Sequence, residues 1–299
     1  MNEVLKSGLD ASVNHVLPAA DGGFLEARYV RRSEGYFICY LSVHTGCRMA
    51  CRFCHLTGTG QTMMTPAGVG ELLEQAARVF SVYDQRVSSG EEMKASKVHF
   101  NFMARGEPLE SPVFLNAVQR NQLTQGLLGM AKARGLEGRL NVSTIMPATL
   151  TAKLEDIFEN PALRLYYSLY SMNPAFRRRW LPRAMDADQA LAAIGAMQAR
   201  LGRQVTLHHA LIQDGNDSLA DVRDILAAIQ RHGVSAKFNL VRYNPLEDRH
   251  GCEPPEEHIM RYYREMCQGM AYGGRVVPRV GQDVFASCGM FVQGTAKAA

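Results

Sequence analysis

Two kinds of segment alternate along the chain. Short segments rich in β-branched and aromatic residues predict buried strands, and longer segments with apolar residues every three or four positions predict amphipathic helices. We expect strands at 36–43, 97–103, 139–144, 163–170, 204–212 and 236–243. We expect helices at 65–83, 111–134, 150–158, 186–201, 217–232 and 255–271.

Several predicted helices also carry boundary signals. Thr65-Pro66 would put proline at a first helical position, and Asp217 could cap the helix that follows it. Gly202 and Gly233 stand where two helices are expected to stop.

Six strands that alternate with six helices predict a parallel sheet with right-handed crossovers. Six units are too few to close an eight-stranded barrel, so we predict an α/β fold, a partial (β/α)6 open barrel. Functional side chains should gather at the carboxyl ends of its strands. We expect a weakly ordered segment at 1–22, one barrel domain over 23–291 and a tail at 292–299.

Composition adds little to this fold prediction. The chain has 299 residues, of which 46% are hydrophobic and 21% charged, which is typical of a globular protein. No run of about 18 apolar residues predicts a membrane span, and the first residues lack an apolar signal-peptide core. We therefore expect a cytoplasmic protein. A net charge of +4 is compatible with a polyanionic partner but does not require one.

The cysteines carry the strongest chemical signal. Their odd number, seven, and the missing secretion signal argue against a disulfide framework. Cys47, Cys51 and Cys54 form a C-x3-C-x2-C loop directly after the first predicted strand. Three thiolates would leave one iron of a cubane cluster open. That iron could bind the amino and carboxylate groups of S-adenosylmethionine (SAM), and an electron from the cluster would then yield a 5′-deoxyadenosyl radical.

Other readings of this loop stay open from the residues alone. A zinc ion could be held with His44 or His55 as the fourth ligand, although that spacing suits zinc poorly. Gly58 and Gly60 would let the backbone approach a ligand closely, or they are ordinary loop glycines.

The C-x3-C-x2-C loop is the hallmark of the radical-SAM superfamily, and further motifs resemble one branch of it. That branch is the adenosine C2/C8 methyltransferases of ribosomal and transfer RNA, the RlmN/Cfr family, and the resemblance runs from Glu26 to Phe291. The matching segments are 103–109 (M-G-x-G-E-P-L), 141–144 (L-S-T), 168–170 (S-L-H), Arg177 with Pro182 (R-x4-P), 215–217 (V-N-D), 243–245 (W-N-P) and 279–289 (R-x-x-G-x-D-I-x-A-A-C-G). The resemblance implies a [4Fe–4S] cluster on the three cysteines and SAM contacts at Gly106, Glu107, Ser143, Ser168, Tyr170 and Asn244.

The predicted fold supports part of this independently. Ser143, Ser168 and Asn244 stand at or just past the ends of predicted strands, so a barrel would bring them to one mouth. A zwitterionic methionine with a ribose and an adenine needs hydroxyls, an amide and a carboxylate together. Taken singly, Glu107 could instead cap a helix, and Asn244 could serve a turn before Pro245.

The resemblance also implies a methyl carrier. In the family, a cysteine near the C-terminus accepts a methyl group from a first SAM, a radical made from a second SAM activates it, and a second cysteine helps to release the adduct. Cys288 fits the carrier, Cys39 the second cysteine and Glu26 the base that takes the ring proton. From the residues alone, both cysteines could equally be packing residues.

The substrate is less well marked. The run 176–183 (FRRRWLPR) could bind phosphates, with Trp180 stacking on a base, or it could be a solvated loop anchored by that tryptophan. Tyr170 replaces the family's His, and Ala104-Arg105 replaces Gly-Met. Only 46 residues precede Cys47, so we expect the family's N-terminal accessory domain to be missing.

We therefore predict a monomeric radical-SAM methyltransferase that modifies C2 or C8 of an adenine in ribosomal or transfer RNA, with flavodoxin or ferredoxin as electron donor. The alternative is a radical-SAM enzyme on a nucleotide, peptide or metabolite. A non-catalytic cluster- or zinc-binding protein ranks last.

Overall fold

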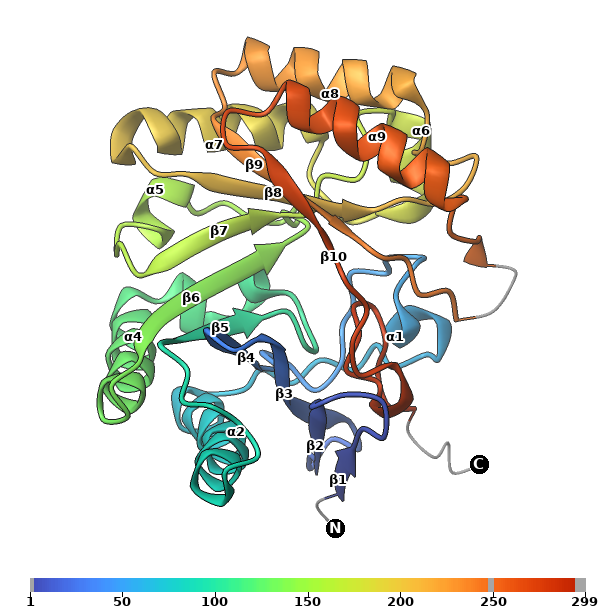
Figure 1. Cartoon of the computed structure of the whole chain (residues 1–299). Coiled ribbons are helices and arrows are strands. Elements are labelled where there is room, and N and C mark those ends of the chain that lie inside the picture. The colour runs from blue at the N-terminus through green and yellow to red at the C-terminus, as the bar shows by residue number, and fades with distance from the viewer. Residues whose placement is uncertain (1–2, 247–249, 294–299) are drawn as a thin grey trace. The chain divides into compact units, whose positions relative to one another are not determined.

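The structure is a computed structural model that describes residues 3–246 and 250–293, and it divides into two compact units. The first unit comprises 1–48, 55–142 and 280–299, and the second comprises 49–54 and 143–279 (Figure 1). The chain passes from the first unit to the second inside one strand, between Val142 and Ser143.

The first unit begins with an antiparallel meander. Strands β1 (Glu3–Lys6), β2 (Val13–Pro18), β3 (Phe24–Ser33) and β4 (Tyr36–Tyr40) pair in chain order, and the parallel strands β5 (Lys97–Phe102) and β6 (Glu137–Thr144) follow β4. Where the sequence predicted weak order at 1–22, the structure thus has two strands. Val13 and Val16 of β2 are buried, and the polar side chains between them conceal the short apolar pattern.

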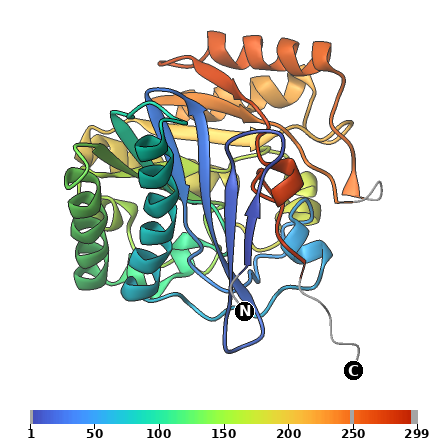
Figure 2. The same ribbon diagram turned by 60° about the horizontal axis from the view of Figure 1, so that its bottom comes forward.

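Helices cross over between the parallel strands of this unit. They are α1 (His55–Gly58), α2 (Val69–Ser89), α3 (Pro112–Leu115) and α4 (Ala117–Lys132), and Figure 2 shows α2 and α4 side by side. Helix α2 buries residues three or four positions apart, which is the pattern of a helix with one apolar face. Its Phe80 and Tyr83 pack against Phe37 of β4, and Phe80 also contacts Phe100 of β5, so aromatic rings join the helix to the sheet.

The second unit contains four parallel strands with helical crossovers. The strands are β7 (Leu163–Tyr167), β8 (Val205–Ala210), β9 (Ala236–Val241) and β10 (Gly274–Val277), paired in chain order. The helices are α5 (Leu154–Ile157), α6 (Pro174–Trp180), α7 (Ala187–Leu201), α8 (Leu219–Arg231) and α9 (Glu256–Gln268).

All six predicted strands are present, as β4 to β9, and all six predicted helical regions contain helix. The structure adds β1–β3, β10, α1 and α6. Two predicted caps differ: α2 begins only after Gly68, and Ser218, not Asp217, caps α8 in a capping box with Asp221. Gly202 ends α7 in the left-handed conformation, as expected. Of the predicted tail, residues 294–299 lie outside the described residues. Among the described residues no helix combines the length and apolarity needed to cross a membrane.

Candidate active site

The cysteine loop follows β4 and crosses between the two units. Cys47 belongs to the first unit and donates its backbone N–H to the Gln61 carbonyl at 3.1 Å. Position 46 next to it requires glycine, because the backbone of residue 63 passes so close that a Cβ would lie 2.0 Å from the Met63 carbonyl oxygen. All three thiols are free of disulfide bonds. Across the described residues, no three His, Cys, Asp or Glu side chains are grouped closely enough to hold a metal ion.

The second-unit part of this loop is held by α6. The backbone N–H of Arg52 donates to the Trp180 carbonyl at 3.0 Å, and its guanidinium lies over the Trp180 ring. Phe53 stacks on Tyr170 with ring centroids 4.3 Å apart. The two cysteines of this segment, Cys51 and Cys54, therefore stand on either side of two anchored residues.

In the first unit, Gly106 and Glu107 follow β5. Gly106 has φ +98°, and a Cβ there would lie 2.5 Å from His44 Nδ1, so only glycine fits. Glu107 is buried and accepts a hydrogen bond from the Leu109 backbone N–H at 2.9 Å, capping the 3-10 turn Pro108–Glu110. Burial also lowers the pKa of His44 to about 4, which leaves its ring neutral at pH 7.

In the second unit, the structure brings two predicted SAM contacts together on a third residue. Ser143 Oγ and Ser168 Oγ lie 2.8 Å and 2.9 Å from the same atom, His208 Nε2. Ser143 lies at the end of β6, Ser168 directly follows β7, and His208 lies within β8. Burial lowers the pKa of His208 to about 4, so the ring is uncharged at neutral pH and can orient hydroxyls without adding charge.

The sequence reasoning missed His208. Its signal was available: a histidine at a strand position, flanked in the predicted sheet by strands that end in serines. His209 beside it points to the opposite face of β8, where its Nε2 lies 3.0 Å from the Tyr262 hydroxyl of α9.

Tyr170, which stands where the family has histidine, is buried and has φ +61°. Two motif residues fix this strained backbone. The Asn216 side-chain amide donates to the Tyr170 carbonyl at 2.9 Å, and Arg177 donates to the Leu169 carbonyl at 2.6 Å and the Met185 carbonyl at 2.7 Å. The R-x4-P and N-D motifs thus hold the loop after β7 in place.

Asn244, the last predicted SAM contact, follows β9 and is buried. Its Oδ1 accepts a hydrogen bond from Arg279 Nε at 3.2 Å, and Arg279 also donates to the Tyr243 carbonyl at 2.6 Å. Arg279, from the closing motif, therefore sets the orientation of this amide.

Cys39 lies on β4 but faces away from the segment that carries Cys288. Side chains alternate along a strand. Ile38 packs with Val284 and Ala286 of the C-terminal segment, whereas Phe37, on the face that Cys39 shares, packs on α2. Cys39 is fully buried, and burial raises the pKa of its thiol. The structure does not bring Cys39 and Cys288 together.

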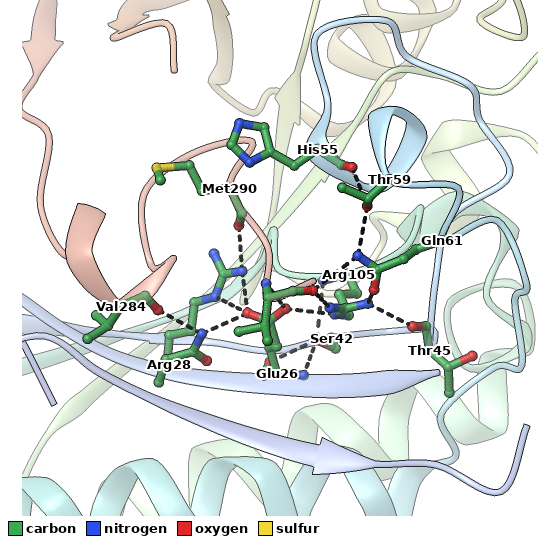
Figure 3. Close-up of polar contacts among 12 residues, drawn as sticks. Glu26, Arg28, Ser42, Thr45, His55, Thr59, Gln61, Arg105, Val284 and Met290 are labelled. Carbon is green, nitrogen blue, oxygen red and sulfur yellow. Dashed lines mark hydrogen bonds and ion pairs between the residues drawn. The ribbon is translucent and has the colours of Figure 1, made fainter. Parts of the chain in front are cut away.

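Cys288 itself is exposed to solvent. Surrounding protein raises the pKa of its thiol, while the guanidinium groups of Arg32 and Arg28 act in the opposite direction. Glu26, the predicted base, is fully buried and paired with Arg28 and Arg105 (Figure 3).

The chain is similar to several known proteins. No family model matches the chain. A probable dual-specificity RNA methyltransferase RlmN from Desulforudis audaxviator is 29% identical over 292 residues, covering 96% of this chain and 85% of the relative. One from Lachnospira eligens is 22% identical over 290 residues, covering 96% and 76%. A radical SAM methyltransferase structure from Sphaerobacter thermophilus superimposes with a TM-score of 0.76 at 20% identity, over 97% of this chain and 80% of its own.

The chain is therefore similar to RlmN methyltransferases over nearly its whole length, and its fold is that of a radical SAM methyltransferase. The predicted partial open barrel is confirmed by that structural likeness. Radical-SAM methyltransferases use a [4Fe–4S] cluster and SAM. The three thiols of the cysteine loop are the donors for such a cluster, but in this structure they are not grouped closely enough to hold a metal ion. These three cysteines, none of them in a disulfide bond, stand within eight residues, and two hydroxyls converge on one neutral histidine.

The first part of the basic run 176–183 lies in α6, which ends at Trp180. Arg178, Arg179 and Arg183 are exposed, whereas Arg177 is buried in its backbone contacts. Trp180 is buried against Phe176 and Arg52, so it has no free face on which a base could stack. Its packing role follows from this burial, and only the arginines remain as candidates for phosphate contacts.

Proposed function

We propose that this radical-SAM methyltransferase transfers a methyl-derived carbon to C2 or C8 of an adenine in RNA, with Cys288 as methyl carrier. The observation that carries the proposal is the state of Cys288: an exposed residue influenced by the charges of Arg28 and Arg32, on a segment in which Val284, Ala286 and Phe291 are buried. The similar proteins are named as probable dual-specificity RNA methyltransferases, which supports RNA as the substrate class.

The residues have distinct tasks in this reaction. Cys47, Cys51 and Cys54 would hold the cluster, which supplies the electron that activates SAM. Ser143, Ser168 and Asn244 would bind SAM through oxygen and amide groups, with Tyr170 packed beside the loop. Gly106 allows the turn after β5 to pack closely against His44, and Glu107 would supply a carboxylate for the amino group of SAM.

The methyl-carrier step needs a thiolate. The sulfur of Cys288 attacks the SAM methyl carbon, its proton passes to solvent, and S-adenosylhomocysteine leaves. The positive charges of Arg28 and Arg32 favour the thiolate over the thiol, which partly offsets the cost of desolvation. We further propose that reduced flavodoxin or ferredoxin supplies electrons, and that the enzyme acts in the cytoplasm as a monomer.

Phosphate contacts would come from α6. The exposed guanidinium groups of Arg178, Arg179 and Arg183 are on or next to the helix that holds Arg52 of the cysteine loop. RNA phosphates bound along them would therefore lie beside residues 52–53 of the cysteine loop.

A second candidate, a radical-SAM methyltransferase with a nucleotide, peptide or metabolite substrate, is favoured by one observation. Cys39 faces α2, so it cannot release a covalent RNA adduct from Cys288 without rearrangement of β4. A different substrate would not require such a release step.

The test is anaerobic turnover of the reconstituted enzyme with SAM, a reductant and either unmodified ribosomal and transfer RNA or free adenosine. Nucleoside mass spectrometry should detect 2-methyladenosine or 8-methyladenosine in RNA only. Cys288→Ala should abolish the product, whereas Cys252→Ala, which removes another exposed cysteine, should not. Product formation by Cys288→Ala, or from free adenosine alone, would overturn the proposal.

A further inference from the structure

The segment that carries Cys288 is fastened to the first unit on both sides of the cysteine. Before it, Val284 and Ala286 pack with Val30 and Ile38, and the Val284 carbonyl accepts a hydrogen bond from Asn14 Nδ2 at 3.0 Å. After it, the Gly289 carbonyl accepts from the His55 backbone N–H at 3.0 Å.

Two buried arginines continue this attachment past Gly289. Arg28 donates to the Met290 carbonyl at 2.8 Å, and Arg105 donates to the Val292 carbonyl at 2.7 Å. The Phe291 ring lies between these contacts, with both guanidinium groups over it at 4.8 Å and 5.7 Å. Gln61 also donates to the Val292 carbonyl, at 3.0 Å. Backbone and ring are therefore held together.

Glu26 joins the two arginines (Figure 3). Its Oε1 accepts from Arg105 Nε at 2.7 Å and from the Val292 backbone N–H at 3.1 Å. Its Oε2 accepts from Arg28 at 2.6 Å and 3.2 Å and from Asn14 Nδ2 at 2.8 Å. A carboxylate has about four lone-pair sites, so these five contacts occupy the whole group.

The charge of Glu26 fits a structural task better than proton abstraction. Burial alone would raise the pKa of its carboxyl, but the charges of Arg28 and Arg105 outweigh burial and hold that pKa below its ordinary value. A base must reach its proton with a free lone pair. Glu26 is fully buried and would have to give up a donor first.

We propose that Glu26, Arg28 and Arg105 form a buried clasp that positions the Cys288 segment, so that Glu26 is a positioning residue and not the proton acceptor. Arg105, which stands where the family has methionine, supplies the contacts particular to this chain. The purpose of the clasp, to present Cys288, rests on the proposed function; its attachment of residues 284–292 does not.

Hydrogen–deuterium exchange of the holoenzyme tests the attachment, because the Val292 amide is bonded directly to Glu26. In Glu26→Gln, an amide group would face one of the two arginines, and exchange in the peptide 288–293 should quicken about tenfold. Arg105→Met should quicken it too, without leaving a carboxylate unpaired, since Arg28 remains. Arg105→Met should quicken exchange less in the Glu26→Gln background than in the wild-type protein, because Glu26 and Arg105 act as a charge pair.

Glu92→Gln is the matched control. Glu92 is a largely buried carboxylate of the same unit, and its polar partners among the described residues are Tyr29, Arg31 and Arg86 rather than the segment 284–292. It should leave exchange in 288–293 within about twofold of wild type. Unchanged exchange in both Glu26→Gln and Arg105→Met would overturn the clasp.

Methylation of Cys288, read by mass spectrometry, separates the clasp from a base. The clasp predicts reduced methylation in Glu26→Gln and Arg105→Met. If Glu26 were instead the base, Glu26→Gln would show full methylation of Cys288 and a stalled RNA–protein adduct. That result would overturn the proposal. If wild-type Cys288 is never methylated, the proposed function fails, while the exchange result still decides whether the clasp exists.

Discussion

Replacing His208 by phenylalanine should weaken SAM binding without unfolding the second unit. The ring volume is nearly kept, but both serine hydroxyls lose their contact with Nε2, at 2.8 Å and 2.9 Å. Each hydrogen bond is worth about 1 kcal/mol net, so the loss is about 2 kcal/mol if both serines bind SAM. The dissociation constant should then rise about 30-fold, since 1.4 kcal/mol is about tenfold.

Isothermal titration calorimetry of the reconstituted enzyme with SAM measures this effect, with urea unfolding as a parallel check on stability. His209→Phe is the control, because His209 faces Tyr262 on the other side of β8. It should lower the free energy of unfolding by about 1–3 kcal/mol through the unpaired buried hydroxyl while keeping SAM affinity. If His208→Phe binds SAM within about twofold of wild type, the serines do not depend on His208, and the reasoning fails.

Four further results are expected. Arg177→Lys should reduce the free energy of unfolding by about 3 kcal/mol, as measured in urea, because it breaks charged contacts to buried carbonyls, whereas Arg178→Lys should change it by less than about 0.5 kcal/mol. Iodoacetamide should label Cys288 but not Cys39 in the native protein, with peptide mass spectrometry as the readout, because Cys39 is buried whereas Cys288 is exposed. The pKa of His209 is lowered to about 3 in the folded protein, so as pH falls the unfolded state takes up a proton on this residue before the folded state does. The free energy of unfolding should therefore fall as pH drops from about 6.5 to about 3. Urea titrations should show a shallower fall in His209→Phe. In Arg178→Ala/Arg179→Ala, RNA affinity should fall and the slope of its logarithm against salt should decrease by about 0.7–1.4, and an unchanged slope would remove α6 from the interface.

The parallel strands were predictable because each is a short run of apolar residues bounded by turn signals. The meander β1–β3 was not predictable, because β2 buries Asn14 and His15 between Val13 and Val16. Burial of Asn14 is compensated by partners in other segments, because Glu26 and the Val284 carbonyl accept its hydrogen bonds. Such long-range compensation leaves no local pattern.

Some residues of the candidate site were predictable from the sequence, and others were not. Motif spacing alone indicated the cysteine loop and the strand-end serines. His208 required knowing that β6, β7 and β8 end together. The orientation of Cys39 required its strand register: one residue more between Cys39 and Cys47 turns the side chain to the other face. Arg105 looked like a departure from a motif, whereas the structure shows it bonded to Glu26.

The most direct test of the central claim is mass spectrometry of the Cys288 peptide after incubation of the reconstituted enzyme with SAM that carries a deuterated methyl group. The account predicts one label-bearing methyl group on Cys288, lost on addition of substrate RNA and reductant, with the carbon recovered in methyladenosine. An unmodified Cys288 in protein that holds its cluster and binds SAM would contradict it.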